Sequence, residues 1–255
     1  MAMNYSKEGL ARLGDDDLAQ EMSDLHAKFR QRHPGMDDIP LPQDRANGPE
    51  SVAQAAPVVR IEAFTPEELE AEIERQAIVY QERGFHRELR YSSDIFKDII
   101  MRLVAAQEES NRGRFDIPAI VIGGRIPAKD QYELLGVEYS LGEQMRDWDT
   151  LGYETPTDPR LVWMQDGSIN LGKDVKSVRD SLSADERGAN IYDGVGLLVA
   201  RPSVLNDHIV GLPGSLYGHQ FSSPTLRLWG LRPSVSYEFV GIPEASTGPA
   251  TCARE

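Results

Sequence analysis

Residues 190 to 202 read Asn190-Ile-Tyr-Asp-Gly-Val-Gly-Leu-Leu-Val-Ala-Arg-Pro202 and form the longest apolar run in this chain of 255 residues. Asn190, followed by Asp193, is typical of a helix start, and Pro202 cannot continue a helix. We therefore predict a short buried helix, with a buried strand as the alternative. Gly194 and Gly196 each lower helix propensity by roughly 1 kcal/mol, so the prediction requires that they permit close packing.

The residues that follow alternate between loop and strand patterns. Leu212-Pro-Gly-Ser215 and Tyr217-Gly-His219 are rich in turn residues and indicate a loop. Apolar residues then recur at every second position on both sides of Gly230-Leu-Arg-Pro233, which predicts a β-hairpin with a four-residue connection. The alternating residues are Leu226, Leu228, Val235, Tyr237 and Phe239.

Several motifs of this region are shared with a known family. They are Gly194-Val-Gly-Leu-Leu198, Pro202, Leu205, Leu212-Pro-Gly-Ser215, Leu226-Arg-Leu-Trp229 and Thr251-Cys-Ala253. On these motifs, the chain resembles an uncharacterised actinobacterial family, the domain of unknown function 5701. With weaker matches that reach back to about Glu74, the resemblance covers about two thirds of the chain. The weaker matches are Gly84-Phe85, Ile117-Pro-Ala-Ile-Val121, Ile126-Pro-Ala128 and Asn170-Leu171. The family carries a Trp-Cys-Trp strand and then Asn-Pro-His-Thr-Trp, where this chain has Tyr237-Glu-Phe239 and Ile242-Pro-Glu-Ala-Ser246. The resemblance implies that Glu238 and Glu244 replace the family's Cys and His.

The charge and the apolar content exclude some classes of partner. The chain has 27 Lys and Arg against 41 Asp and Glu, a net charge of −14, which disfavours nucleic acid and anionic membrane surfaces. It contains no run of 18 apolar residues and no apolar N-terminal segment, so we expect a cytoplasmic protein. The single cysteine, Cys252, excludes an internal disulfide. We interpret it as a small apolar anchor for the C-terminal segment, with a reactive thiol as the alternative.

Composition divides the chain into three parts. Residues 1–33 are predicted to form an amphipathic helix, and residues 34–63 a proline-rich linker. Residues 64–255 are predicted to form the core domain. The apolar stripe of the N-terminal helix can contact either this core or a partner, and the sequence leaves both open. The stripe consists of Leu18, Met22, Leu25 and Phe29.

We predict that the core domain is α+β, with a mixed or antiparallel sheet, helices mainly on one side, and the N-terminal helix as an appendage. The strands are expected near 117–122, 161–171 and 225–240, with Asp166-Gly167 as a hairpin turn between 161–164 and 168–171. Pro118 favours a strand start or a sheet edge. One helix is predicted to begin at the capping box Thr65-Pro-Glu-Glu68. A second is predicted to begin at Ser92 or Ser93, with Ile95, Ile99, Ile100 and Leu103 facing inward. Further helices are predicted from Ala128, after Ser140 and over 177–182.

Four residues near the apolar run are candidates for catalysis. Ser215 lies among glycines on the predicted loop, where a hydroxyl can be exposed and backbone N–H groups can line an oxyanion site. His219 or His208 can serve as the base, and Asp207 can orient it. A hydrolase or transferase using this set is therefore the alternative function, and a structural loop serine with surface histidines is the competing interpretation.

Metal and cofactor motifs are incomplete. His208 and His219 are spaced unlike the ligands of a compact metal site, so no metal is predicted. The segment Gly167-Ser-Ile-Asn-Leu-Gly172-Lys173 resembles a phosphate-binding loop, but Asp174 stands where a Ser or Thr is required, so no cofactor is predicted.

Because each catalytic motif is incomplete, the sequence favours a non-catalytic binding or accessory protein. We expect it to recognise a small molecule, a peptide or a protein partner through residues 211–219 and the adjacent hairpin.

Overall fold

The computed structural model describes residues 64–105, 114–141, 156–217 and 222–254. The chain divides into the units Met1–Val59 and Arg60–Glu255, and all described residues belong to the second. The predictions for the N-terminal helix, the linker, the helix after Ser140 and His219 lie outside the described residues. In this unit the fold is α+β, as predicted, but its strands form two sheets rather than one.

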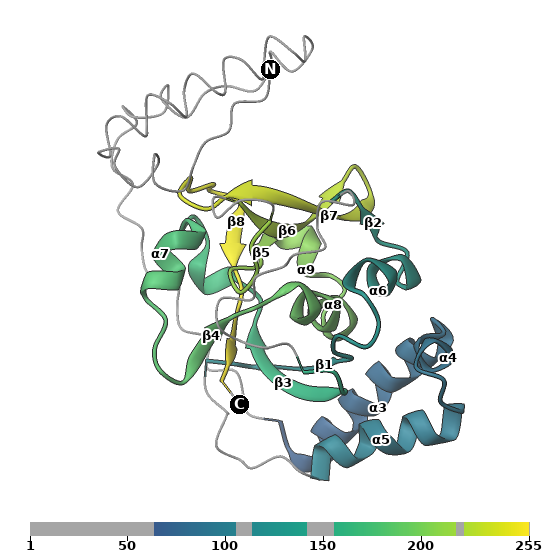
Figure 1. The fold of residues 1–255 in the computed structure, drawn as a ribbon. Helices are drawn as coiled ribbons and strands as arrows, with labels where there is room; N and C mark the ends of the chain where they lie inside the picture. Colours follow the sequence, from purple (N-terminus) through teal and green to yellow (C-terminus); the bar gives the residue numbers. More distant parts are fainter. Residues whose placement is uncertain (1–63, 106–113, 142–155, 218–221, 255) are drawn as a thin grey trace, which may run out of the picture. The chain divides into compact units, whose positions relative to one another are not determined.

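The described helices and strands follow one another in an order that mixes both types (Figure 1). The helical elements are α3 Pro66–Glu82, α4 Phe85–Glu88, α5 Ser93–Ala105, α6 Ala128–Leu134, the 3-10 helix η4 Ser168–Asn170, α7 Val175–Asp180, α8 Ile191–Ala200 and α9 Val204–Asp207. The strands are β1 Ile117–Val121, β2 Glu138–Tyr139, β3 Arg160–Gln165, β4 Glu186–Gly188, β5 Ile209–Gly211, β6 Ser222–Trp229, β7 Arg232–Phe239, β8 Thr247–Pro249 and β9 Thr251–Ala253.

The first sheet has the order β1-β3-β9-β4, and all of its neighbouring strands are antiparallel. Helices α3 and α8 both pack against β1, and α5 packs against α3 and β3. The predicted capping box of Thr65 is present at the start of α3. On α5 the prediction was partly wrong, because Ile95 is 53% exposed while Phe96 faces the core in its place.

Gln76 on α3 covers the open side of the edge strand β1. Its Nε2 donates to Pro118 O at 2.7 Å, and its Oε1 accepts the Ile120 N–H at 2.9 Å. Tyr80, one turn further along α3, donates its hydroxyl to Ile120 O at 2.7 Å. These side chains bond the groups that another strand would need, so they protect the sheet edge from further pairing.

The second sheet is mixed and has the order β2-β7-β6-β5-β8. Its centre is the predicted hairpin of β6 and β7, but the connection is shorter than predicted. Trp229 pairs with Arg232, so only Gly230 and Leu231 connect the strands. Gly230 has a φ of +65°, as the first position of a tight type II′ turn requires.

Helix α8 is buried along almost its whole length, as the apolar run predicts. Both of its glycines lie at close approaches. A side chain at Gly194 would meet the Tyr132 hydroxyl, and one at Gly196 would meet Ile120 O on β1 at 2.8 Å. The two glycines therefore allow α8 to pack directly against its neighbours, which offsets their low helix propensity.

The C-terminal segment belongs to both sheets. Strand β8 pairs in parallel with β5, and β9 pairs with β3 and β4. Ala250 lies between them and is fully buried. Its N–H donates to Gly211 O at 2.9 Å, and its carbonyl accepts the Ala189 N–H at 3.0 Å. The last strands are therefore structural elements, and the sequence analysis did not predict them as strands.

The predicted hairpin partner 168–171 was wrong, because these residues form the 3-10 helix η4 and part of the turn after it. β3 pairs instead with β1 and β9, which lie far away in the sequence. Gly167 has a φ of +100°, and its backbone lies against Gly248 on β8. The Asp166-Gly167 turn thus directs the chain toward the second sheet. None of the described helices is long and apolar enough to cross a membrane.

Candidate functional site

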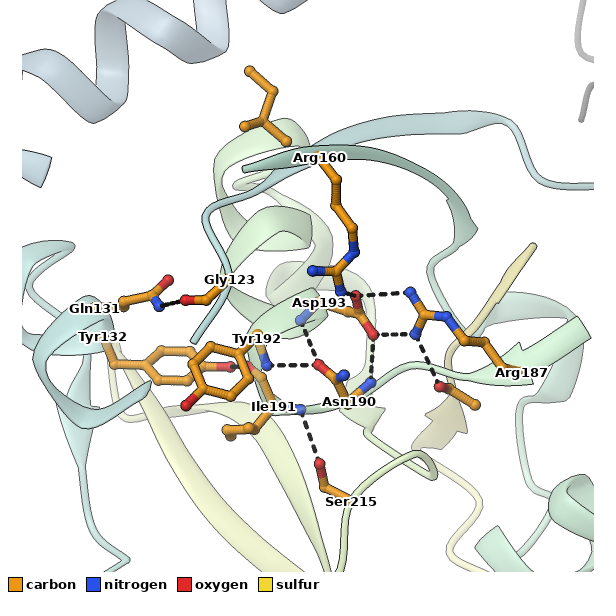
Figure 2. Close-up of polar contacts among 12 residues, drawn as sticks. Gly123, Gln131, Tyr132, Arg160, Arg187, Asn190, Ile191, Tyr192, Asp193 and Ser215 are labelled. Atoms are coloured by element: carbon orange, nitrogen blue, oxygen red, sulfur yellow. Dashed lines mark hydrogen bonds and ion pairs between the residues drawn. The ribbon is translucent and has the colours of Figure 1, made fainter. Parts of the chain in front are cut away.

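Ser215, the candidate nucleophile of the alternative function, is fully buried. Its hydroxyl accepts the N–H of Ile191 at 3.0 Å, as Figure 2 shows. Its carbonyl accepts a hydrogen bond from Arg179 at 3.0 Å and one from Ser223 at 3.2 Å. The exposed hydroxyl that the catalytic alternative requires is therefore absent, because the turn that carries Ser215 packs against the start of α8. Its hydroxyl satisfies one of the N–H groups that every helix leaves unbonded at its first turn.

Asn190 and Asp193 form the capping box of α8 (Figure 2). Asp193 is completely buried and forms ion pairs with Arg187 and Arg160. Burial alone would raise the pKa of Asp193, but the two arginines hold it below the usual range. The carboxylate thus stays ionised and joins α8 to β3 and β4. We interpret this cluster as structural, because each group in it contacts another part of the fold.

His208 and Asp207 do not join Ser215. Among the described residues, no hydrogen bond links Ser215 to either of them. His208 is buried, and its Nε2 lies 2.9 Å from the carbonyl oxygen of Asp166, while Asp207 is exposed on α9. The candidate set from the sequence is therefore not assembled as a catalytic site in the part of the chain that is described, and His219 lies outside that part.

Cys252 is fully buried in β9, where it faces Met164 and Arg187 in register. This position fits an anchor for the C-terminal segment. No group of three or more His, Cys, Asp or Glu among the described residues can hold a metal ion. Asp174, which interrupts the phosphate-loop motif, accepts the Ser177 N–H at 2.8 Å and caps α7.

The structure has a hollow that no motif indicates, with a volume of about 280 Å³. We call it the Val137 hollow. It lies where α3, the turn between α6 and β2, the end of α8 and the start of β7 meet. Its lining is aliphatic except for two arginines and contains no Asp or Glu. The lining residues are Arg75, Val79, Arg83, Leu135, Val137, Leu198, Val199, Pro202 and Pro233.

The two arginines of the Val137 hollow differ in their partners. Arg75 donates two hydrogen bonds to Glu72, at 2.6 and 2.8 Å. It also donates to the carbonyls of Val199 and Ala200, both at 3.0 Å, and so provides a hydrogen-bond donor for the last carbonyl groups of α8. The Arg83 guanidinium forms no ion pair or hydrogen bond with any described residue. Arg83 is therefore the cation in this hollow that a ligand can engage.

The closed end of the β6–β7 hairpin lies next to the Val137 hollow, and Figure 1 shows it beside β2. Pro233 lines the hollow, and Arg232 lines a second hollow that shares Val137. At the hairpin end, Trp229 is 70% exposed and Leu231 is 94% exposed. We call Trp229 to Arg232 the hairpin end. Exposed large apolar residues beside a concave surface are typical of a binding region.

A carboxyl pair lies at the opposite end of β7. Glu238 Oε1 accepts hydrogen bonds from Arg227 at 3.2 Å and from Thr247 at 3.1 Å, and the Glu238 side chain also bonds Glu244. Burial and the negative charge of Glu244 raise the pKa of Glu238 to about 7. These are the two positions at which the resemblance places the family's Cys and His. Here they join β7 to the segment that leads into β8.

Comparisons with protein-family models, with curated proteins and with solved structures find no match. The family resemblance therefore stays a prediction, and the function is inferred from the geometry.

Sequence patterns missed the Val137 hollow because its lining comes from four separate elements. Val79 and Leu198 are positions of apolar helix faces, and nothing in the sequence distinguishes them from core residues. The available signal was the hairpin end, where Trp229 and Leu231 fall at a turn that should be polar.

Proposed function

We propose that this protein is a cytoplasmic, non-catalytic binding protein that contacts its ligand or partner through the Val137 hollow and the hairpin end. The sequence favoured residues 211–219 as the contact surface. The described residues of that segment are buried or half-buried, and Ser215 holds the start of α8. The binding surface is therefore assigned to the hairpin and the hollow beside it.

One observation carries this proposal: Trp229 and Leu231 are exposed in a hairpin whose next residues, Arg232 and Pro233, line the two neighbouring hollows. Tryptophan is strongly enriched among the residues that dominate binding energy at interfaces. An aliphatic concave wall with a few polar groups is the usual composition of a small-molecule site. Together they form a surface that can bury apolar groups of a ligand without rearranging the core.

The proposal can be tested by filling the hollow. Val79 is a half-buried lining residue on α3, and Val79→Trp places a large side chain in the hollow. Ile78 is 44% exposed on the same helix and does not line the hollow, so Ile78→Trp is the matched control. A collection of small amphipathic compounds is screened against both variants and the wild type by saturation-transfer NMR.

We expect a set of compounds that bind the wild type and Ile78→Trp but lose binding to Val79→Trp. Circular dichroism checks that both variants are folded. If the compounds that bind the wild type bind Val79→Trp equally well, the Val137 hollow is not the binding site and the proposal is wrong.

A further inference from the structure

We propose that the Val137 hollow binds an aliphatic monocarboxylate, whose tail lies against Val79, Leu198 and Pro233 and whose carboxylate pairs with Arg83. This inference rests on the binding function proposed above and names the chemical class of the ligand.

The walls of the hollow favour an aliphatic tail. Seven of the nine lining residues are Val, Leu or Pro, and none is aromatic. A flat ring inside the hollow would therefore find no aromatic lining residue for stacking. A flexible hydrocarbon chain can instead contact the branched side chains, and it gains roughly 0.8 kcal/mol for each methylene removed from water.

The charge at the hollow favours an anion. The chain has a net charge of −14, yet the lining of the hollow holds two arginines and no carboxylate. Arg75 is held by Glu72 and by the last carbonyls of α8. The guanidinium of Arg83 is without an ion pair among the described residues. Its planar fork matches a carboxylate with two parallel hydrogen bonds.

The surroundings favour a single negative charge over a double one. The second hollow, which shares Val137, is lined by Glu133 and Glu138 as well as Arg232. Glu133 is paired with Lys129 at 2.9 Å. A phosphate monoester would bring nearly two charges to the one available arginine of the Val137 hollow, next to a hollow that Glu133 and Glu138 line. A monocarboxylate needs only Arg83.

The volume limits the ligand to a small molecule. The hollow of about 280 Å³ lies just below the range of roughly 300–1,000 Å³ that is usual for drug-sized ligands. A linear acid of medium length is therefore the appropriate probe, and we choose octanoate. Octanamide has the same shape without the charge, and octylammonium has the same tail with the opposite charge.

The test measures binding of octanoate, octanamide and octylammonium by isothermal titration at neutral pH. The variants are Arg83→Gln, which removes the guanidinium, and Arg83→Lys, which keeps the positive charge but cannot donate two parallel hydrogen bonds to a carboxylate. Arg87→Gln is the matched control, because Arg87 is an exposed arginine on α4 that does not line the hollow.

We expect octanoate to bind the wild type and Arg87→Gln equally. Arg83→Gln should weaken it about 10- to 100-fold, the loss typical of a hydrogen-bonded charge pair, and Arg83→Lys should weaken it less. Octanamide should bind about as weakly to the wild type as octanoate binds to Arg83→Gln. Octylammonium should bind more weakly still.

Two results would overturn the ligand class without overturning the binding function. In the first, octanoate and octanamide bind the wild type with equal affinity and neither binds Val79→Trp. The hollow would then bind the hydrocarbon tail without selecting the carboxylate. The other is no binding of any of the three compounds, while the screened compounds still lose binding in Val79→Trp. If octanoate binding is unaffected by both Val79→Trp and Arg83→Gln, the ligand class and the site are both wrong.

Discussion

Gly188 on β4 and Gly214 in the turn after β5 lie backbone against backbone. A side chain on Gly188 would come within 2.6 Å of Gly214 N, and one on Gly214 would collide with Gly188 O. The Gly214 N–H donates to Ala189 O at 2.8 Å across the same contact. This close approach brings the turn against the start of α8, where Ser215 bonds Ile191. The glycines of the family-like motif are thus explained by packing.

Gly214→Ala is expected to destabilise the protein by about 1–3 kcal/mol, because the added methyl group meets rigid backbone. Gly241→Ala is the matched control. A side chain at Gly241 meets no atom within 4 Å, and its φ is not positive, so a change within about 0.5 kcal/mol is expected. Urea unfolding followed by circular dichroism measures both. Equal midpoints for Gly214→Ala and wild type would show that the contact is not tight in solution.

Ser215→Ala is expected to lower the free energy of unfolding by about 1–3 kcal/mol, because it leaves the buried Ile191 N–H without its partner. Ser203→Ala is the control, since Ser203 is exposed and its side chain makes no capping bond at the start of α9. Neither change should alter octanoate binding. The structural assignment fails if Ser215→Ala is as stable as the wild type but loses turnover in a panel of ester, amide and phosphoester substrates.

The stability of the protein is expected to fall as the pH rises from about 5 to about 8. The pKa of Glu238 rises from 4.5 in the unfolded chain to about 7 in the fold, first because of burial and then because of Glu244. Between these values the folded state binds the proton and the unfolded state does not, so protonation stabilises the fold at low pH. This stabilisation is lost as the pH rises through the folded pKa, by on the order of 2 kcal/mol.

Glu238→Gln should remove most of this pH dependence and leave the protein more stable than the wild type at pH 8. Glu70→Gln, an exposed position on α3, removes the same charge and should leave the pH dependence unchanged. Urea midpoints at half-unit intervals of pH measure the effect. A wild-type midpoint that stays constant or rises from pH 5 to pH 8 contradicts it.

Helix starts and short-range features could be predicted from the sequence, because the residues that determine them are neighbours in the chain. The capping boxes at Thr65 and Asn190 are present, the glycines of α8 lie at close contacts, and Pro118 lies on an edge strand. The capping boxes depend on backbone chemistry within a few positions. The glycines of α8 were predicted to lie at close contacts because their low helix propensity needs an offset. The helix that follows Asn190 also shows that the apolar run was interpreted correctly, because a buried strand was the alternative.

Long-range pairing was not predictable in the same way. The segment 168–171 follows a strand and a turn, so a local hairpin was expected. The two partners of β3 are instead β1 and β9, which are distant in the sequence. The turn residues around Ser215 left its exposure open. Its burial depends on Arg179, which donates to its carbonyl, and on Gly188, which packs against the neighbouring Gly214 only in the folded chain. The Val137 hollow is likewise formed by distant elements.

The central claim is that the Val137 hollow binds the ligand and that residues 212–215 have only a structural role. Methyl NMR tests this claim most directly. Protein labelled at its Ile, Leu and Val methyl groups is titrated with octanoate. We predict that the methyl signals of Val79, Val137 and Leu198 shift, and that those of Ile191 and Leu212 beside Ser215 do not. Shifts confined to Ile191 and Leu212 would place the site at the Ser215 turn and contradict the account.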